Sequence, residues 1–288
     1  MPRDVPMTCP GEATSSSRPP HSEAASLGLP PAIRACLFDL DGVVTQTAQF
    51  HAAAWKETFD PFLRRRAAQG HGPYAVFDEA DFERYVDGKP RADGVRSFLA
   101  ARGVELPEGD THDAPIVETI HGLANRKNDL VRALIERVGV RVYDDSCRYV
   151  GAVRAAGLRC AVVSASANCR VVLEAAGIAP LFEVVVDGLT AARCRLRGKP
   201  APDTFLAAAR LLAVEPREAA VFEDALAGVE AGRDGGFGYV VGVDRGDRAD
   251  ALRAHGADVV VTDLTALLRA PEPGGRSNDV VPRRGRRT

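Results

Sequence analysis

The sequence has no apolar run that approaches the length of a membrane-spanning helix, and its 288 residues carry a formal net charge of only −2. The weak net charge gives no indication of a polyanionic partner such as nucleic acid. The six cysteines form no C-x-x-C pair, and several lie in apolar runs, where a free thiol behaves as a small core residue. We therefore expect a cytoplasmic protein with neither disulfides nor a zinc site, and with no nucleic-acid or membrane partner.

The two ends of the chain differ in composition from the middle. Residues 1–30 are rich in Pro, Ser, Gly and Ala and lack the apolar core of a signal peptide, so we predict a disordered N-terminal arm. Residues 271–288 are similar but end in four arginines, and we predict a disordered basic tail there. A solvated tail is favoured over a nucleic-acid or membrane role for this end.

Short apolar runs alternate with helical patterns between these ends. The runs are near-continuously apolar, as in strands buried on both faces of a parallel sheet. They occupy residues 33–40, 158–164, 184–186, 219–222, 239–243 and 258–261. The alternation predicts a doubly wound, Rossmann-like α/β core.

Residues 48–140 interrupt this alternation, because they contain no good buried strand. Amphipathic patterns at 51–59, 95–101 and 129–138 predict helices instead. We therefore expect a helical cap domain inserted after the first strand, with the α/β core built from residues 31–47 and 141–270.

Charged and polar residues gather at the predicted carboxyl ends of the strands. Asp39 and Asp41 end the first strand in DLDGV, and Ser164 opens SASAN after the second. Lys199 lies in a later loop, GKPAPD, and Glu223 and Asp224 follow the strand at 219–222. Ligands of open α/β sheets bind beyond these strand ends, so the side chains should meet at one site.

These residue types suit a divalent cation next to a phosphate. Asp39 and Asp224 offer the hard oxygen ligands that Mg²⁺ prefers, and Lys199 and Ser164 can hold phosphate oxygens. Asp39 is then the candidate nucleophile that forms an aspartyl-phosphate, and Asp41 the general acid/base. A second-shell or purely structural role explains Glu223 equally well.

Other interpretations of the same residues are weaker. A calcium loop starting at DLDG requires Gly and Glu where Val44 and Phe50 stand. A nucleotide P-loop around Lys199 lacks its first glycine, and the G-x-S-x-G of a serine nucleophile is absent. Taken singly, Ser166 and Asn168 are better explained as helix caps.

With these elements in order, the sequence resembles the haloacid-dehalogenase superfamily of phosphatases and phosphomutases. The resemblance covers about residues 33–268 and is closest to the β-phosphoglucomutase-like family. It is carried by FDLDGV, HAAAWK (51–56), RKND (126–129), SASAN and GKPAPDTFLAAA. The resemblance implies a helical cap between the first and second motifs.

The resemblance also implies roles for individual residues. Asp39 would be the phosphorylated nucleophile and Asp41 the acid/base, with Mg²⁺ held by the Asp39 carboxylate, the Asp41 backbone carbonyl and Asp224. Ser164 and Lys199 would hold the transferred phosphoryl group, and Glu223 would lie at or just outside the metal shell. The implied substrate-binding residues are Gly42, His51, Gly88, Arg91, Ser166 and Asn168. The residues alone leave two of these open, because Arg91 could be a solvated surface arginine and His51 could pack inside the cap beside Trp55.

The sequence departs from the family pattern at a few positions. Ala167 stands where a substrate-contacting lysine is usual, and Lys89 in DGKPR is a candidate for the missing charge. Ala225 stands where a serine is usual, and Gln46 where the mutase often has aspartate. No catalytic group is lost by these changes.

The predicted activity is interconversion of β-glucose 1-phosphate and glucose 6-phosphate through a sugar bisphosphate. The expected partners are a small sugar phosphate and glucose 1,6-bisphosphate as activator. The alternative is a phosphatase on the same scaffold, in which water replaces the second sugar oxygen. A regulatory protein with a residual phosphate pocket is a third class, but such a protein has no need of Asp41.

Overall fold

The computed structural model describes residues 24–268, and its centre is a six-stranded parallel sheet with the order β3-β2-β1-β4-β5-β6. The strands are β1 (Ala35–Phe38), β2 (Arg159–Val163), β3 (Val184–Val186), β4 (Ala219–Glu223), β5 (Tyr239–Val243) and β6 (Val259–Val261). Each predicted strand is present, which confirms the doubly wound α/β class. The chain builds outward from β1 in both directions, so the topological switch point lies at β1.

Alternate residues of each strand face opposite layers of helices, as the two-residue period of a strand requires. In β1, Cys36 and Phe38 pack in the same cluster as α5 and α6, whereas Ala35 and Leu37 pack in the cluster of α8 and α9. Both faces of the sheet are therefore covered, which explains why the strands are apolar throughout. The helices of the core are α5 (Asp144–Ala155), α6 (Cys169–Ala175), α7 (Gly188–Arg193), α8 (Asp203–Leu211), α9 (Leu226–Asp234) and α10 (Ala249–His255).

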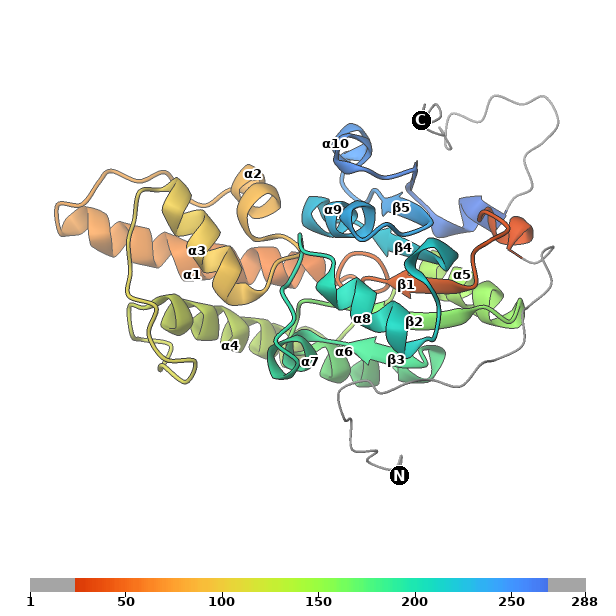
Figure 1. The fold of residues 1–288 in the computed structure, drawn as a ribbon. Helices are drawn as coiled ribbons and strands as arrows, with labels where there is room; N and C mark the ends of the chain where they lie inside the picture. The colour runs from red at the N-terminus through yellow and green to blue at the C-terminus, as the bar shows by residue number, and fades with distance from the viewer. Residues whose placement is uncertain (1–23, 269–288) are drawn as a thin grey trace.

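Helices alone fill the segment between β1 and α5, which we call the cap (residues 48–140). Figure 1 shows α1, α3 and α4 extending away from the sheet as a separate layer. The cap has its own apolar core, in which Phe59 contacts Trp55 and Phe98 with ring centroids 5.0 and 4.1 Å apart. Its elements are α1 (Ala48–Ala68), α2 (Glu79–Asp81), a π-helical turn (Phe82–Val86), α3 (Arg91–Ala101) and α4 (Ile120–Val138).

The two chain segments that join the cap to the core run side by side. Thr45 and Val142 form an antiparallel bridge. On either side of this bridge, Gln46 N donates to Arg141 O and Tyr143 N donates to Val44 O, each at 2.9 Å. The cap is thus attached through one short paired hinge, close to the end of β1.

The predicted disordered arm is wrong for its last residues. Residues 24–30 include a 3₁₀ turn, Ala25–Leu27, and both Leu27 and Leu29 are buried in the core. The hydroxyl of Tyr149 in α5 donates to Leu27 O at 2.9 Å. Burial of these two apolar side chains favours the ordered turn. The overall composition of residues 1–30, rich in Pro and Ser, gives no sign of it. Residues 1–23 and 269–288 lie outside the described residues, and the second stretch includes the whole predicted basic tail, 271–288.

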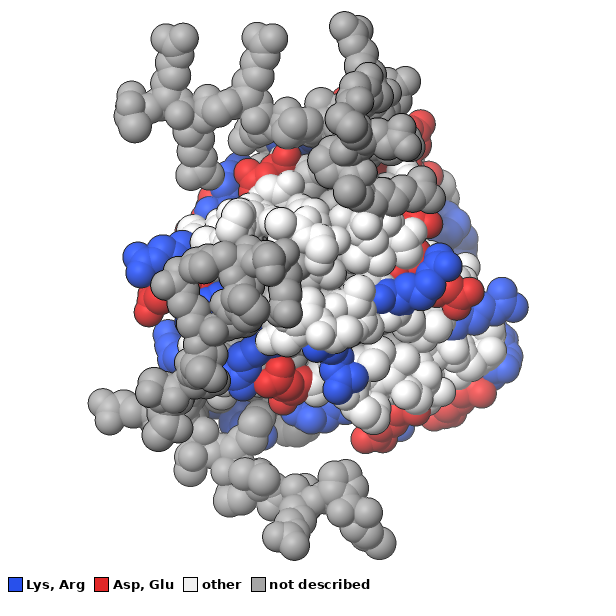
Figure 2. All heavy atoms as spheres, turned by 90° about the vertical axis from the view of Figure 1, so that its right-hand side faces the viewer, with Lys and Arg blue, Asp and Glu red and all other residues white. Residues whose placement is uncertain are grey.

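The composition also led to expectations about the cysteines, membrane-spanning helices and surface charge. Cys36, Cys160 and Cys169 are buried free thiols, as their apolar surroundings predict. Within residues 24–268, no helix is both long and apolar enough to cross a membrane. Figure 2 shows the end of the core that faces away from the cap, where basic and acidic side chains border uncharged residues. The described surface visible there carries charges of both signs.

Candidate active site

Four side chains that are far apart in the sequence meet at the carboxyl edge of the sheet. Asp39 follows β1, Ser164 follows β2, Asp224 follows β4, and Lys199 lies in the loop before α8. All four are buried. Because β1 lies between β2 and β4, the three strand ends are neighbours and deliver their residues to one place.

Lys199 is the central cation of this site. Its ammonium group forms ion pairs with both Asp39 and Glu223, and it also donates to Val163 O at 3.1 Å. Burial alone would lower the pKa of Lys199, but the two carboxylates outweigh it and raise the pKa above its usual value. Lys199 therefore stays charged, with its ammonium directed at Asp39.

The acidic residues beside Lys199 fit a divalent cation. Oxygen atoms of Asp39, Glu223 and Asp224 all lie within 4.8 Å of one another. Burial raises the pKa of Asp39 and Asp224 well above the usual range, and neighbouring carboxylates raise both pKa values further. A bound divalent cation would favour ionised carboxylates, and hard oxygen donors of this kind are suited to one.

Glu223 shares the Lys199 ammonium with Asp39, but it is also fixed by the backbone. Its second carboxylate oxygen accepts a hydrogen bond from Ala225 N at 3.1 Å. Both oxygens of Glu223 therefore have a partner within the protein. This arrangement favours the outer position that the resemblance implied for Glu223.

Gly42 allows the chain to pass close to Asp224. Its φ of +100° lies in the region that favours glycine, and a Cβ atom added there would lie 1.9 Å from Asp224 Oδ2. Gly42 was expected to contact substrate. In the structure it lies against the carboxylate instead, so its side-chain hydrogen provides the room that Asp224 needs.

Asp41 lies on the cap side of the same loop and is held by three partners. Thr47 Oγ1 donates to its Oδ1 atom, Ser164 Oγ donates to Oδ2 at 3.1 Å, and His51 Nε2 lies 3.4 Å from Oδ1. Burial would raise the pKa of Asp41, but His51, Thr47 and Lys127 together lower it below its usual value. Asp41 is therefore held in its ionised form.

His51 belongs to a chain of polar groups that joins the cap to Asp41, rather than to cap packing alone. Lys127 Nζ lies 2.9 Å from His51 Nδ1 and 5.0 Å from the centre of the Trp55 ring. Burial and the neighbouring Lys127 lower the pKa of His51, so we assign a neutral ring that accepts from Lys127 and donates from Nε2 to Asp41.

Lys127 was not singled out by sequence reasoning, although it lies within the RKND motif. Burial lowers its pKa to about 7, and the nearby Arg91 acts in the same direction. A signal was available, because Lys127, Val131 and Ile135 recur every four residues on the buried face of α4. A lysine on such a face needs a polar partner, which is His51 here.

The SASAN loop connects its own residues and also reaches the cap. Ser166 N donates to Ser164 Oγ at 3.0 Å, and Asn168 N donates to Ser166 Oγ at 3.1 Å. The side-chain amide of Asn168 donates to Asn128 of α4 at 3.1 Å. Ser166 and Asn168 therefore act as local turn-forming residues, and both also line the pocket between core and cap.

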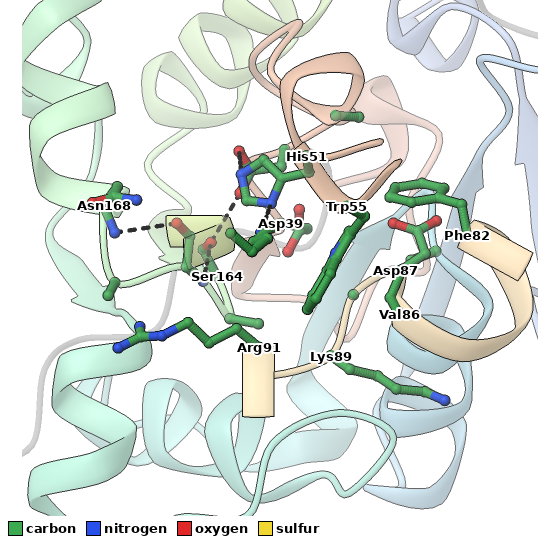
Figure 3. Close-up of a pocket in the computed structure, with 18 of the residues that line it drawn as sticks. Asp39, His51, Trp55, Phe82, Val86, Asp87, Lys89, Arg91, Ser164 and Asn168 are labelled. Atoms are coloured by element: carbon green, nitrogen blue, oxygen red, sulfur yellow. Dashed lines mark hydrogen bonds and ion pairs between the residues drawn. The ribbon is translucent and has the colours of Figure 1, made fainter. Parts of the chain in front are cut away.

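Cap side chains such as His51, Trp55 and Arg91 surround this pocket, as Figure 3 shows. Arg91 lines the pocket and extends to the side where Asn168 lies, with its guanidinium 3.4 Å from Asn125 Oδ1. Lys89 points the other way, and its ammonium donates to Arg84 O and Ser97 Oγ, each at 3.2 Å. The expectation that Lys89 supplies the charge missing at Ala167 is wrong for this structure.

Gly88 places the loop between Val86 and Arg91 directly on the core. Its φ is +70°, and an added Cβ atom would lie 2.9 Å from Ala225 Cβ. The small residue at 225, where a serine is usual in the resembling family, is therefore part of the contact surface for the cap.

A sequence model described as haloacid dehalogenase-like hydrolase matches residues 33–236, which include every residue of this site. The chain belongs to this family. It is 54% identical over 257 residues to a protein of Mycobacterium bovis named "Beta-phosphoglucomutase", covering 87% of this chain and 98% of that protein.

Two further relatives support the family assignment over core and cap. A Bacillus subtilis protein named "Beta-phosphoglucomutase" is 30% identical over 240 residues, covering 82% of this chain and 93% of that protein. The crystal structure of β-phosphoglucomutase from Clostridium difficile has a TM-score of 0.64 and 27% sequence identity, covering 82% of this chain and 93% of that one.

Replacing Gly42 by Ala tests the approach of this loop to Asp224. The added methyl group must displace the carboxylate, so we expect Mg²⁺ affinity to fall roughly 10- to 100-fold, as for other residues that support metal ligands. Calorimetric titration with Mg²⁺ measures this. Gly70→Ala is the matched control, because Gly70 also has a positive φ, of +88°, but open space around it. Unchanged affinity in G42A would contradict the interpretation.

Replacing Lys127 by Met tests its depressed pKa. Between about pH 7 and 10, an unfolded lysine keeps a proton that folded Lys127 releases, so the unmodified protein gains stability as the pH rises. Lys127→Met removes this gain. We expect the unfolding free energy of the unmodified protein minus that of K127M, from urea denaturation, to become more positive across this window. A difference that is flat with pH across this window would count against the buried lysine.

Proposed function

We propose that this protein interconverts β-glucose 1-phosphate and glucose 6-phosphate by carrying a phosphoryl group on Asp39, with Mg²⁺ as cofactor. The observation that carries the proposal is the pairing of a Lys199-bound Asp39 with a separately held, ionised Asp41 in one pocket beneath the cap. The relatives named β-phosphoglucomutase support it, because their similarity extends over both core and cap.

Asp39 is the proposed nucleophile. One of its carboxylate oxygens attacks phosphorus, the bond from phosphorus to the sugar oxygen breaks, and an aspartyl-phosphate forms. Lys199 balances negative charge on the phosphoryl oxygens, with the Ser164 hydroxyl beside it. When bound by Asp39 and Asp224, together with the Asp41 carbonyl that the family resemblance implies, Mg²⁺ would reduce the repulsion between the carboxylate and the phosphate dianion.

Asp41 is the proposed proton carrier. A hydroxyl group of the sugar phosphate attacks the aspartyl-phosphate, and Asp41 takes the proton of that hydroxyl as the new bond forms. In the reverse direction, Asp41 returns the proton to the departing sugar oxygen. His51 and Thr47 keep Asp41 ionised and aimed, which is what an acceptor requires before the transfer.

The cap residues are proposed to hold the phosphate that is not being transferred. Arg91 supplies the charge, Asn168 lies on the same side of the pocket, and Ser166 also lines it. Gly88, which lines the pocket, would approach the sugar phosphate through its backbone. A bisphosphate that turns round under the cap can then present either end to Asp39.

Hydrolysis is the competing reaction on this scaffold, and the family description names hydrolases. Water would attack the aspartyl-phosphate in place of the second sugar hydroxyl. The two reactions share Asp39, Asp41, Lys199 and Asp224, so the cap decides between them by excluding water. A protein that only binds phosphate is disfavoured, because binding does not require a second carboxylate, Asp41, positioned by hydrogen bonds.

A paired assay tests the proposed activity. Purified protein with Mg²⁺, β-glucose 1-phosphate and a trace of glucose 1,6-bisphosphate is expected to form glucose 6-phosphate without matching release of inorganic phosphate. Free phosphate in step with substrate loss would identify a phosphatase instead. Asp39→Asn removes the nucleophile at nearly unchanged volume and should abolish both products.

Arg91→Ala separates the mutase from simple hydrolysis. Charge-assisted hydrogen bonds contribute about 1.5–3 kcal/mol, so glucose 6-phosphate formation should fall roughly tenfold or more, while hydrolysis of a small aryl phosphate changes little. Both rates are measured on the same preparation. Arg84→Ala is the control, because Arg84 is exposed and belongs to the same stretch of the cap. Equal loss of both activities in R91A would remove Arg91 from the proposed phosphate grip.

A further inference from the structure

One guanidinium connects the cap to the metal-binding edge of the core and is not used in the chemistry above. Arg248 lies on the core at the start of α10, and its side chain is only 15% exposed. It contacts two carboxylates of the cap, Asp87 at 3.2 Å and Glu83 at 3.6 Å. It also lies 3.8 Å from Asp224 Oδ2. One cation thus faces acidic groups of both domains.

The core holds Arg248 in a fixed position. The carboxylate of Asp244, at the end of β5, accepts hydrogen bonds from Gly246 N at 3.0 Å and Arg248 N at 2.9 Å. Asp244 is itself buried. The loop that carries Arg248 is therefore ordered by the sheet and does not depend on the cap.

The cap approaches the core closely in the residues that follow Asp87. Gly88 lies against Ala225, and a Cβ atom at Gly198 would lie 2.0 Å from Pro90 Cγ. Only residues as small as Gly198 and Ala225 permit this approach. Figure 3 shows Asp87 next to Phe82 and Val86, at the side of the pocket away from Asn168. The Asp87–Arg248 pair thus lies across a tightly packed contact between the two domains.

We propose that Arg248 is a positioning residue that holds the cap closed through Asp87 and Glu83. If the cap swings away at the hinge, both carboxylates leave with it, and Arg248 stays beside Asp224. The ion pairs with the cap exist only in the closed form, so they stabilise that form selectively. The catalytic advantage of a closed cap rests on the proposed function, because the closed cap keeps water from the aspartyl-phosphate.

Closure is measured first without reference to activity. Trp55 is the single tryptophan of the sequence, and it is buried at the wall of the pocket between cap and core. Acrylamide quenching of its fluorescence therefore reports opening in the full-length protein. We expect Arg248→Met and Asp87→Asn each to increase the quenching constant severalfold, and the double variant to add little to either. Arg248→Lys should restore part of the protection, since it keeps the charge.

Arg253→Met is the matched control on the same helix. Arg253 pairs with Asp250, also in α10, and that ion pair makes no link to the cap. The acrylamide quenching constant of Trp55 in R253M should equal that of the unmodified protein. Quenching of R248M equal to that of R253M, or fully additive effects of R248M and D87N, would overturn the inference.

The kinetic readout is the ratio of inorganic phosphate released to glucose 6-phosphate formed. R248M should raise this ratio about tenfold or more, because removal of one partner of a buried ion pair leaves the other charge unpaired and favours opening. R253M should leave the ratio unchanged. An unchanged ratio in R248M would overturn the proposal that cap closure by Arg248 excludes water from the reaction. If the unmodified protein forms no glucose 6-phosphate, the proposed function fails, while the quenching result still decides the role of Arg248.

Mg²⁺ titration separates positioning from general damage to the fold. Arg248 places a positive charge 3.8 Å from Asp224, so its removal should leave the Mg²⁺ affinity unchanged or increase it. Weakened Mg²⁺ binding in R248M, together with a lowered melting temperature, would show that Arg248 supports the site structurally and would overturn its role in closure.

Discussion

The active site depends on the electrostatic balance of carboxylates buried at one edge of the sheet. Asp39, Glu223 and Asp224 are buried and Asp41 beside them is only partly exposed, so water does little to stabilise their charges. Such a group is tolerated only if cations are aimed at it. The structure supplies them from several directions, and each cation determines how the carboxylate nearest to it behaves.

The cations divide the carboxylates into separate functions. Lys199 pairs with Asp39 and Glu223, so the proposed nucleophile lies next to a permanent positive charge. The route from Lys127 through His51 ends on Asp41 and lowers its pKa, so that the proposed proton acceptor is ionised. Two carboxylates two residues apart in the sequence thereby acquire different environments. In the proposed mechanism, this difference allows one of them to attack phosphorus while the other transfers a proton.

The same balance links the chemistry to the cap. His51, Lys127 and Asp87 all belong to the cap, yet each acts on a charged group at the edge of the core. Closing the cap therefore completes the electrostatic arrangement as well as covering the pocket. An enzyme that transfers phosphoryl groups between sugar hydroxyls needs both effects at once, because water competes with the second hydroxyl.

The sequence by itself determined the sheet and the residues at its strand ends. Buried parallel strands must be apolar throughout, and polar residues that directly follow them must lie at the ligand-binding edge, so Asp39, Ser164 and Asp224 could be placed without a structure. The absence of a buried strand in residues 48–140 also predicted the helical cap, and GKPAPD pointed to Lys199. The ordered residues 24–30 were missed, because two buried leucines are hidden in a stretch whose composition resembles a disordered arm.

Only the tertiary structure decided which cation serves which carboxylate. Lys89 was the candidate for the lysine missing at Ala167, but its ammonium points away from Asn168 and is bonded to Arg84 O and Ser97 Oγ. Lys127 and Arg248 come from distant helices, and no local pattern says which carboxylate each one meets. Electrostatic pairing depends on distances of a few ångströms between separate elements, whereas strand and helix patterns depend on neighbours in the chain.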